Sequence, residues 1–181
     1  MRWDDLFDDL EAQLAAAERD EALAQVAERT RAERAQVGWF DRVAAAVGES
    51  VDCMTPAGPV QGRIADLGKD WLVLEESGRG SAIVPASAVV SIGGLGRRSD
   101  KATTPARRFG LGVALRAVSR DRSPVAVHDV AGGLWAGTID FVGSDHLEVV
   151  LHPADALPRG AAVTGRRVVP WSSIAIVRRI G

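Results

Sequence analysis

Basic side chains are concentrated in one stretch of the chain, between residues 97 and 122. This stretch holds eight basic residues against two acidic ones. Clustered arginines bind phosphate groups through paired hydrogen bonds, and such binding weakens as the salt concentration rises. We therefore predict a surface for RNA or another nucleic acid, although the same composition also fits a solvated linker that balances an acidic N-terminal segment. The predicted phosphate contacts are Arg97, Arg98, Lys101, Arg107, Arg108, Arg116, Arg120, Arg122, Arg166 and Arg167.

The sequence contains no recognisable catalytic or metal-binding spacing. The histidines are isolated from one another, and His128 alternates with Val125 and Val127, which predicts that it faces outward from a strand. The single cysteine, Cys53, falls on the predicted inward face of a strand and is expected to be an inert core thiol. We therefore expect no enzymatic activity, no metal and no cofactor.

The N-terminal segment, residues 1–37, has the composition of an acidic amphipathic helix. It lacks glycine and proline and is rich in alanine, glutamate, arginine and leucine, which are strong helix formers. Apolar residues recur there at spacings of three and four, which places them on one helix face. We predict that this face binds a second copy or a partner protein, whereas its acidic character disfavours a membrane surface. The face consists of Trp3, Leu6, Phe7, Leu10 and Leu14.

Composition restricts the class of protein further. Hydrophobic residues make up 46% and charged residues 25% of the 181 residues, as in a globular domain. One cysteine excludes an internal disulfide, and no run of apolar residues is long enough to span a bilayer. The first residues are too acidic for a signal peptide, so a cytoplasmic protein is expected.

Two parts of the chain repeat one pattern of glycines, prolines and apolar residues. Residues 60–72 match 135–147 at an offset of 75, and residues 83–89 match 168–174 at an offset of 85. The difference falls in residues 152–164, which are predicted to form a loop. Each copy follows a short apolar helix and has the alternation of five short strands, which favours a duplicated small β-structure.

This unit of one helix and five strands resembles the Sm-like family of RNA-binding ring proteins, through Gly62-Arg-Ile64 and Gly137-Thr-Ile139 in the second strand of each copy. The resemblance implies an α+β, mainly β fold. A long N-terminal helix (1–37) would precede two tandem five-stranded barrels (38–96 and 111–181), joined by a basic linker (97–110). Because family members pair the fourth strand of one subunit with the fifth strand of the next, it also implies self-association through strand edges.

The sequence departs from the family at the motif that reads RNA bases. Val84-Pro85-Ala86-Ser87 and Val169-Pro170-Trp171-Ser172 stand at that place, and the chain has no tyrosine. The RNA pocket of the family therefore does not transfer to this chain. Two hypotheses follow: a non-enzymatic RNA-binding protein that uses its arginines, or a protein-interaction scaffold or oligomerisation module that does not bind nucleic acid.

Overall fold

The structure is a computed structural model that describes residues 3–100, 108–153 and 163–180, and the chain forms two compact units. The first unit, Met1–Gly38, contains the helix α1 (Trp3–Ala35). The second, Trp39–Gly181, contains the sheet and two shorter helices, α2 (Trp39–Ala45) and α3 (Leu111–Arg120). No helix in the described ranges is both long enough and apolar enough to cross a membrane.

The sequence of helix α1 contains neither glycine nor proline, so nothing in it interrupts the helix. Leu23 and Val26 are exposed on it, and the Thr30 hydroxyl donates a hydrogen bond to the Val26 carbonyl (2.9 Å). The predicted partner-binding face stays a prediction, because its side chains lie outside the described part of the structure. These are Trp3, Leu6, Phe7, Leu10 and Leu14.

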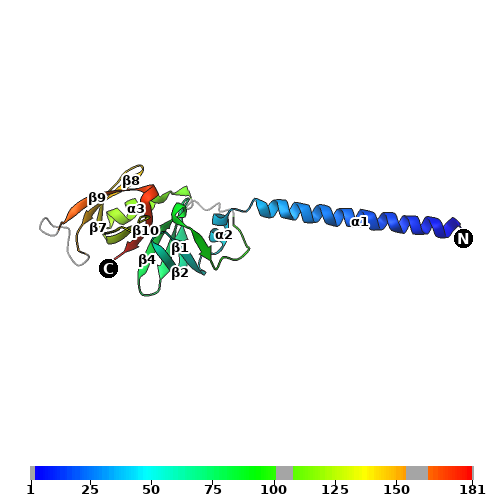
Figure 1. Cartoon of the computed structure of the whole chain (residues 1–181), viewed down its shortest axis with the longest axis horizontal. Coiled ribbons are helices and arrows are strands. Elements are labelled where there is room, and N and C mark those ends of the chain that lie inside the picture. The colour runs from blue at the N-terminus through cyan, green and yellow to red at the C-terminus, as the bar shows by residue number, and fades with distance from the viewer. Residues whose placement is uncertain (1–2, 101–107, 154–162, 181) are drawn as a thin grey trace. The chain divides into compact units, whose positions relative to one another are not determined.

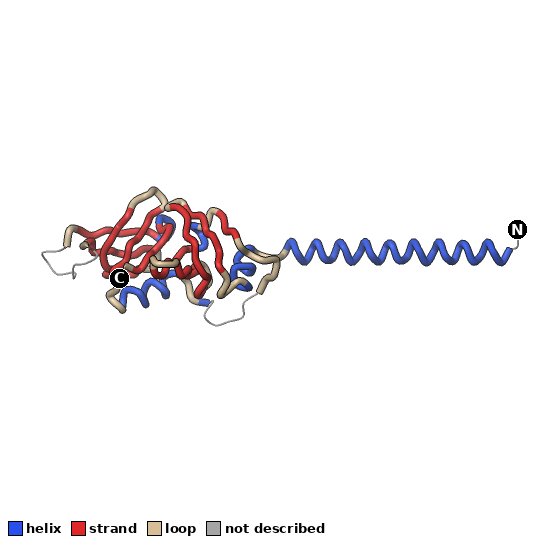
Figure 2. The backbone as a smooth tube through the Cα atoms, turned by 90° about the horizontal axis from the view of Figure 1, so that it is seen from below, coloured by secondary structure: helices blue, strands red, loops and turns tan. Residues whose placement is uncertain are grey.

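Ten strands form one antiparallel sheet in the second unit (Figures 1 and 2). Their order across the sheet is β5-β1-β2-β3-β4-β10-β6-β7-β8-β9. We call β1–β5 with α2 the first half and β6–β10 with α3 the second half. The strands are β1 (Ser50–Thr55), β2 (Gly58–Leu67), β3 (Trp71–Glu76), β4 (Gly80–Pro85), β5 (Ser91–Gly93), β6 (Pro124–Asp129), β7 (Leu134–Val142), β8 (His146–Leu151), β9 (Gly165–Pro170) and β10 (Ile174–Arg179).

The prediction of two closed five-stranded barrels is wrong. Strand β4 pairs with β10, through Val177 opposite Ile83 and Arg178 opposite Ala82, so it does not close onto β5. Within the described residues, β5 pairs with β1 alone and β9 pairs with β8 alone. The result is a single open sheet with a free edge at each end. Alternation in the sequence indicates which face a residue occupies, but it does not indicate which strand edge will pair.

The two halves of the sheet nevertheless make the same local contacts. A bulge interrupts β2 between Ile64 and Asp66, and another interrupts β7 between Ile139 and Phe141. The turn before the next strand and the start of the following 3-10 helix carry matching backbone hydrogen bonds in both halves. These are Gly68 N to Trp71 O (2.9 Å), Ala86 N to Asp70 O (2.8 Å), Gly143 N to His146 O (2.9 Å) and Trp171 N to Asp145 O (2.8 Å).

Each half packs its own hydrophobic core, and each core takes residues from the other half. The first core, with Leu72 and Leu74, includes Ile176 of β10. The second core, with Leu115 of α3, includes Trp71 of β3. Full burial of one such side chain contributes about 1.5–3 kcal/mol. Because each core contains side chains from the other half, the two halves form one folding unit.

Candidate functional site

The basic residues predicted to bind phosphate are spread over separate parts of the second unit. Two lie beside α2, two lie on α3, two lie on the edge strand β9, and two flank α3. Lys101 and Arg107 fall outside the described residues. The described members, in that order, are Arg97, Arg98, Arg116, Arg120, Arg166, Arg167, Arg108 and Arg122.

Several of these guanidinium groups are engaged within the second half. Arg166 Nη1 lies 3.1 Å from Asp140 Oδ2 in an ion pair. The Arg167 guanidinium lies over the Trp135 ring, 4.6 Å from its centroid, and Arg116 Nη2 donates to the Gly143 carbonyl (3.3 Å). Arg116, Arg166 and Arg167 therefore already contact groups of their own half.

One group of arginines does come together, beside α2. Arg42 donates from Nε to the Gly96 carbonyl (3.0 Å) and from Nη2 to the Leu95 carbonyl (3.1 Å). These bonds hold the start of the basic linker against α2. A cavity of about 280 Å³ lies there, and Arg42, Arg97 and Arg98 line it together with Glu49.

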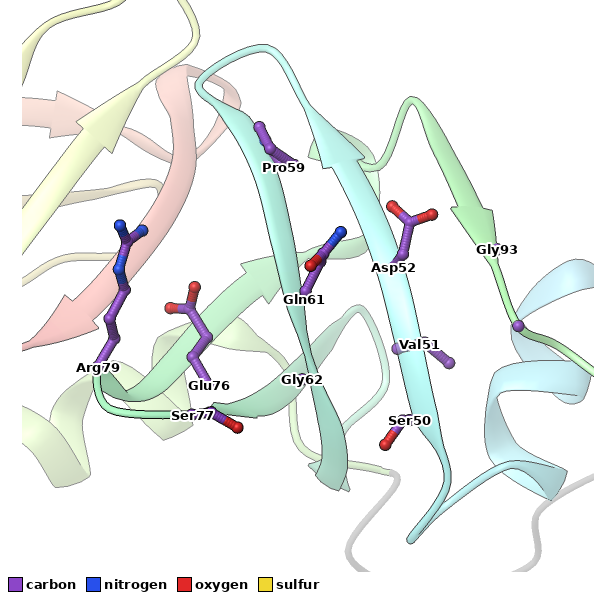
Figure 3. Close-up of a pocket in the computed structure, with 11 residues that line it drawn as sticks. Ser50, Val51, Asp52, Pro59, Gln61, Gly62, Glu76, Ser77, Arg79 and Gly93 are labelled. Atoms are coloured by element: carbon purple, nitrogen blue, oxygen red, sulfur yellow. The ribbon is translucent and has the colours of Figure 1, made fainter.

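A groove of about 720 Å³ lies on the first half of the sheet (Figure 3). Asp52 on β1 and Gln61 on β2 are paired across neighbouring strands, while Glu76 and Arg79 come from the hairpin that joins β3 to β4. A side chain at position 62 would clash with the Glu75 carbonyl, so the residue there is glycine and no side chain covers the backbone at this point of the groove. No group of three potential metal ligands occurs in the described ranges.

A partly buried ionic cluster joins the two halves, and we call Glu76, Arg178 and His128 the junction cluster. Arg178 of β10 donates from Nε to Glu76 Oε2 (2.8 Å) and from Nη2 to Oε1 (3.3 Å). Its Nη1 donates to His128 Nε2 of β6 (3.1 Å). His128 alternates with the buried Val125 and Val127, as predicted, so it lies on the face of the sheet opposite the core, where Arg178 partly covers it. No local sequence signal points to this cluster, because Glu76 and Arg178 lie 102 residues apart.

The junction cluster favours a neutral His128. Burial lowers the pKa of His128 below its ordinary value of 6.5, and the positive charge of Arg178 lowers the pKa further, while Glu76 acts in the opposite direction. The hydrogen bond from Arg178 requires a lone pair on Nε2, which a protonated imidazole lacks. Protonation of His128 would therefore remove one of the cluster's hydrogen bonds.

The two free edges of the sheet carry exposed apolar side chains. Beside β5, Val90 is 66% exposed, and a groove of about 370 Å³ runs along Trp39, Val89, Val90 and Ile92. We call this the edge groove. On β9, Val168 is 62% exposed. Free edges with apolar side chains are the usual places where a strand from another chain adds to a sheet.

Comparison with known proteins identifies no relative. No protein-family model, no curated protein and no solved structure matches this chain. The function must therefore be inferred from the geometry of the second unit.

The thiol of Cys53 does not contribute a reactive group. It is buried in the first core, and burial, together with the charge of Asp52, raises its pKa to about 11. A thiol with this pKa stays protonated at neutral pH, and the thiolate is the form that reacts.

Proposed function

We propose that this protein is a non-enzymatic self-assembly module whose copies join head to tail through the two free edges of the sheet. Strand β9 of one copy would add to β5 of the next. The internal pairing of β4 with β10 is the template for this contact, because β9 corresponds to β4 and β5 corresponds to β10 at an offset of 85 residues.

The observation that carries the proposal is the contrast in exposure between equivalent residues. Ile83 of β4 packs against the second core, whereas its equivalent on the free edge, Val168, is 62% exposed. Ala175 of β10 is completely buried, whereas its equivalent, Val90, is 66% exposed. The free edges thus present the apolar residues that the internal junction covers.

The template also specifies a register between copies. Val177 lies opposite Ile83 and Arg178 lies opposite Ala82 in the internal junction. Transferred by the same offset, Ile92 would lie opposite Val168 of the next copy, and Gly93 opposite Arg167. The Val168 side chain would then meet the edge groove.

The variant Val168→Asp tests the proposal in the full chain. A carboxylate at this edge would have to be buried without a partner, so we expect the concentration-dependent increase in mass of the native protein to be lost. Sedimentation velocity over a range of concentrations measures this. The control is Val130→Asp, an exposed valine in the β6–β7 turn, which should assemble like the native chain. A native protein that stays monomeric, or a Val168→Asp variant that still assembles, would contradict the proposal.

Binding of RNA or another polyanion is the second candidate function, supported by the meeting of Arg42, Arg97 and Arg98 around one cavity. Fluorescence anisotropy with single-stranded RNA at about 50 and 200 mM salt tests it, because phosphate contacts weaken steeply over that range. We expect Arg97→Ala with Arg98→Ala to weaken binding. Arg166→Ala, which removes an arginine already paired with Asp140, should have little effect. Absence of binding at the lower salt concentration would exclude this function.

A further inference from the structure

Two pairs of equivalent strands compete for partners in this sheet. Strands β4 and β9 offer equivalent edges, and strands β5 and β10 are equivalent strands that could occupy them. In the structure β10 occupies β4 of its own chain. Self-assembly through β5 and β9 requires that this internal pairing forms first and that the wrong combinations are disfavoured.

Backbone pairing at the internal junction is short. Only two residue pairs join β4 to β10, whereas five join β10 to β6 on the other side of the same strand. A ladder of two pairs specifies its partner weakly, because register in sheets is set mainly by side chains that one face buries. Side chains must therefore supply much of the selection.

The junction cluster provides side chains of this kind. The Glu76 side chain is 6% exposed and the Arg178 side chain is 14% exposed, and two hydrogen bonds join them. A buried charge is costly when its partner is missing, so each member penalises any arrangement that removes the other. His128 accepts a third hydrogen bond from the same guanidinium group.

The free edges have no equivalent of the cluster. The residue that corresponds to Arg178 is Gly93 on β5, and the residue that corresponds to Glu76 is Leu151 on β8. If β10 added to β9 of another chain, Arg178 would lie near Leu151 and would have no carboxylate to pair with. If β5 added to β4, Glu76 would be buried without its arginine. Both wrong combinations leave an unpaired charge.

We infer that Glu76, Arg178 and His128 are specificity-determining residues that select the pairing of β10 with β4 over the alternative strand pairings. This inference rests on the proposed function in one respect: the selection leaves β5 and β9 as the edges available to other copies. A polar cluster that specifies pairing, rather than adding stability, is an established use of buried charge in proteins.

A disulfide reporter across β4 and β10 tests the inference. Ser81→Cys and Arg179→Cys place thiols on residues that line the same small cavity at the junction. The reporter is built with Val168→Asp, so that assembly through β9 does not contribute. Native-length and tagged chains are unfolded in urea, refolded together, oxidised and separated on a non-reducing gel. With the cluster intact, we expect the disulfide to form within single chains.

Removal of the cluster should reduce the amount of this disulfide. In Glu76→Leu with Arg178→Leu no buried charge remains, so we expect the chain to fold, β5 to compete with β10 for β4, and the fraction of chains that carry the disulfide between β4 and β10 to fall. The matched control is Arg63→Leu with Glu75→Leu, which removes an exposed ion pair between β2 and β3 and should keep the disulfide within chains. If the Glu76 and Arg178 double variant forms as much of the disulfide between β4 and β10 as this control, the inference is wrong.

A charge exchange between two chains gives a second test that does not depend on the leucine variant. One chain carries Glu76→Arg and the other carries Arg178→Glu, so each has a mismatched junction by itself. A reciprocal exchange of β10 restores one arginine–carboxylate pair at each junction. We expect refolding of the mixture to give disulfides between unlike chains, and neither chain alone to give linked dimers. Lack of unlike dimers in the mixture would overturn the inference, whether or not the native protein assembles through β5 and β9.

Discussion

At the scale of single residues, His128 links the junction to pH. It faces Arg178 of β10 and Glu76 of β3, and its hydrogen bond from Arg178 requires the neutral imidazole. Its pKa in the folded state lies below the ordinary 6.5. The unfolded chain therefore binds a proton at a higher pH than the folded chain does, and acid favours unfolding.

We predict that the stabilising contribution of neutral His128 is complete above pH 6.5 and is lost as the pH falls through the lower folded-state pKa. The slope from one such group is at most about 1.4 kcal/mol per pH unit. Urea unfolding at pH values from about 7.5 to about 5, the range over which an ordinary histidine titrates, measures this slope. His128→Gln keeps an acceptor for Arg178 and should flatten the curve. An unchanged slope in His128→Gln would assign the effect to other groups.

At the scale of elements, helix α3 is held at its N-terminal end by a turn of the first half. Asp70 Oδ1 accepts a hydrogen bond from Leu111 N (2.8 Å), and the Phe109 carbonyl accepts from Lys69 N (2.9 Å) and from Trp71 Nε1 (3.0 Å). A carboxylate at this position satisfies a backbone N–H that the helix itself leaves unpaired. The turn therefore positions α3 over the second core.

We predict that Asp70→Ala destabilises the fold by about 0.5–2 kcal/mol, the usual cost of losing a helix cap. Asp145→Ala is the control, because Asp145 occupies the equivalent turn of the second half but its exposed carboxylate bonds to the adjacent His146. Chemical unfolding of both variants measures the difference. Equal stability losses would show that Asp70 has no capping role.

The sequence could predict elements better than their partners. Alternation and turn residues indicated short strands in each half, and the matching turns at Gly68 and Gly143 make the same backbone hydrogen bond. The edge that β10 occupies could not be predicted, because both β4 and β9 end in Val-Pro and have similar patterns. The phosphate surface stays a prediction: Arg166 and Arg167, which were expected to extend the basic segment, contact Asp140 and Trp135 of their own half.

At the scale of the whole molecule, the proposed contact between copies is heterologous, because β9 of one copy meets β5 of another. Such contacts close into rings when the rotation between copies allows it, and otherwise extend as filaments. Either assembly needs both edges on every copy. A chain with one disabled edge can therefore occupy only one end of an assembly.

We predict that Val168→Asp chains, which keep β5, shorten assemblies of the native protein when the two are mixed. A native β9 edge would still add to β5 of the variant, whose own altered β9 cannot continue. Sedimentation velocity of mixtures should show a decrease in mass as the variant fraction rises, whereas Val130→Asp, which keeps both edges, should not reduce it. Assemblies that keep their native size in the presence of Val168→Asp would contradict the head-to-tail arrangement.

The use of Ile176 in the first core affects how the chain folds during synthesis. Strand β10 leaves the ribosome after the other nine strands of the sheet, and the first core lacks Ala175 and Ile176 until β10 emerges. At about 5–20 residues per second, the interval between β5 and Ile176 lasts roughly 4–17 s. Throughout that time β4 has an open edge and nascent chains on neighbouring ribosomes carry the same strands. The order of translation therefore makes the choice of the correct β10 a kinetic problem as well as a thermodynamic one.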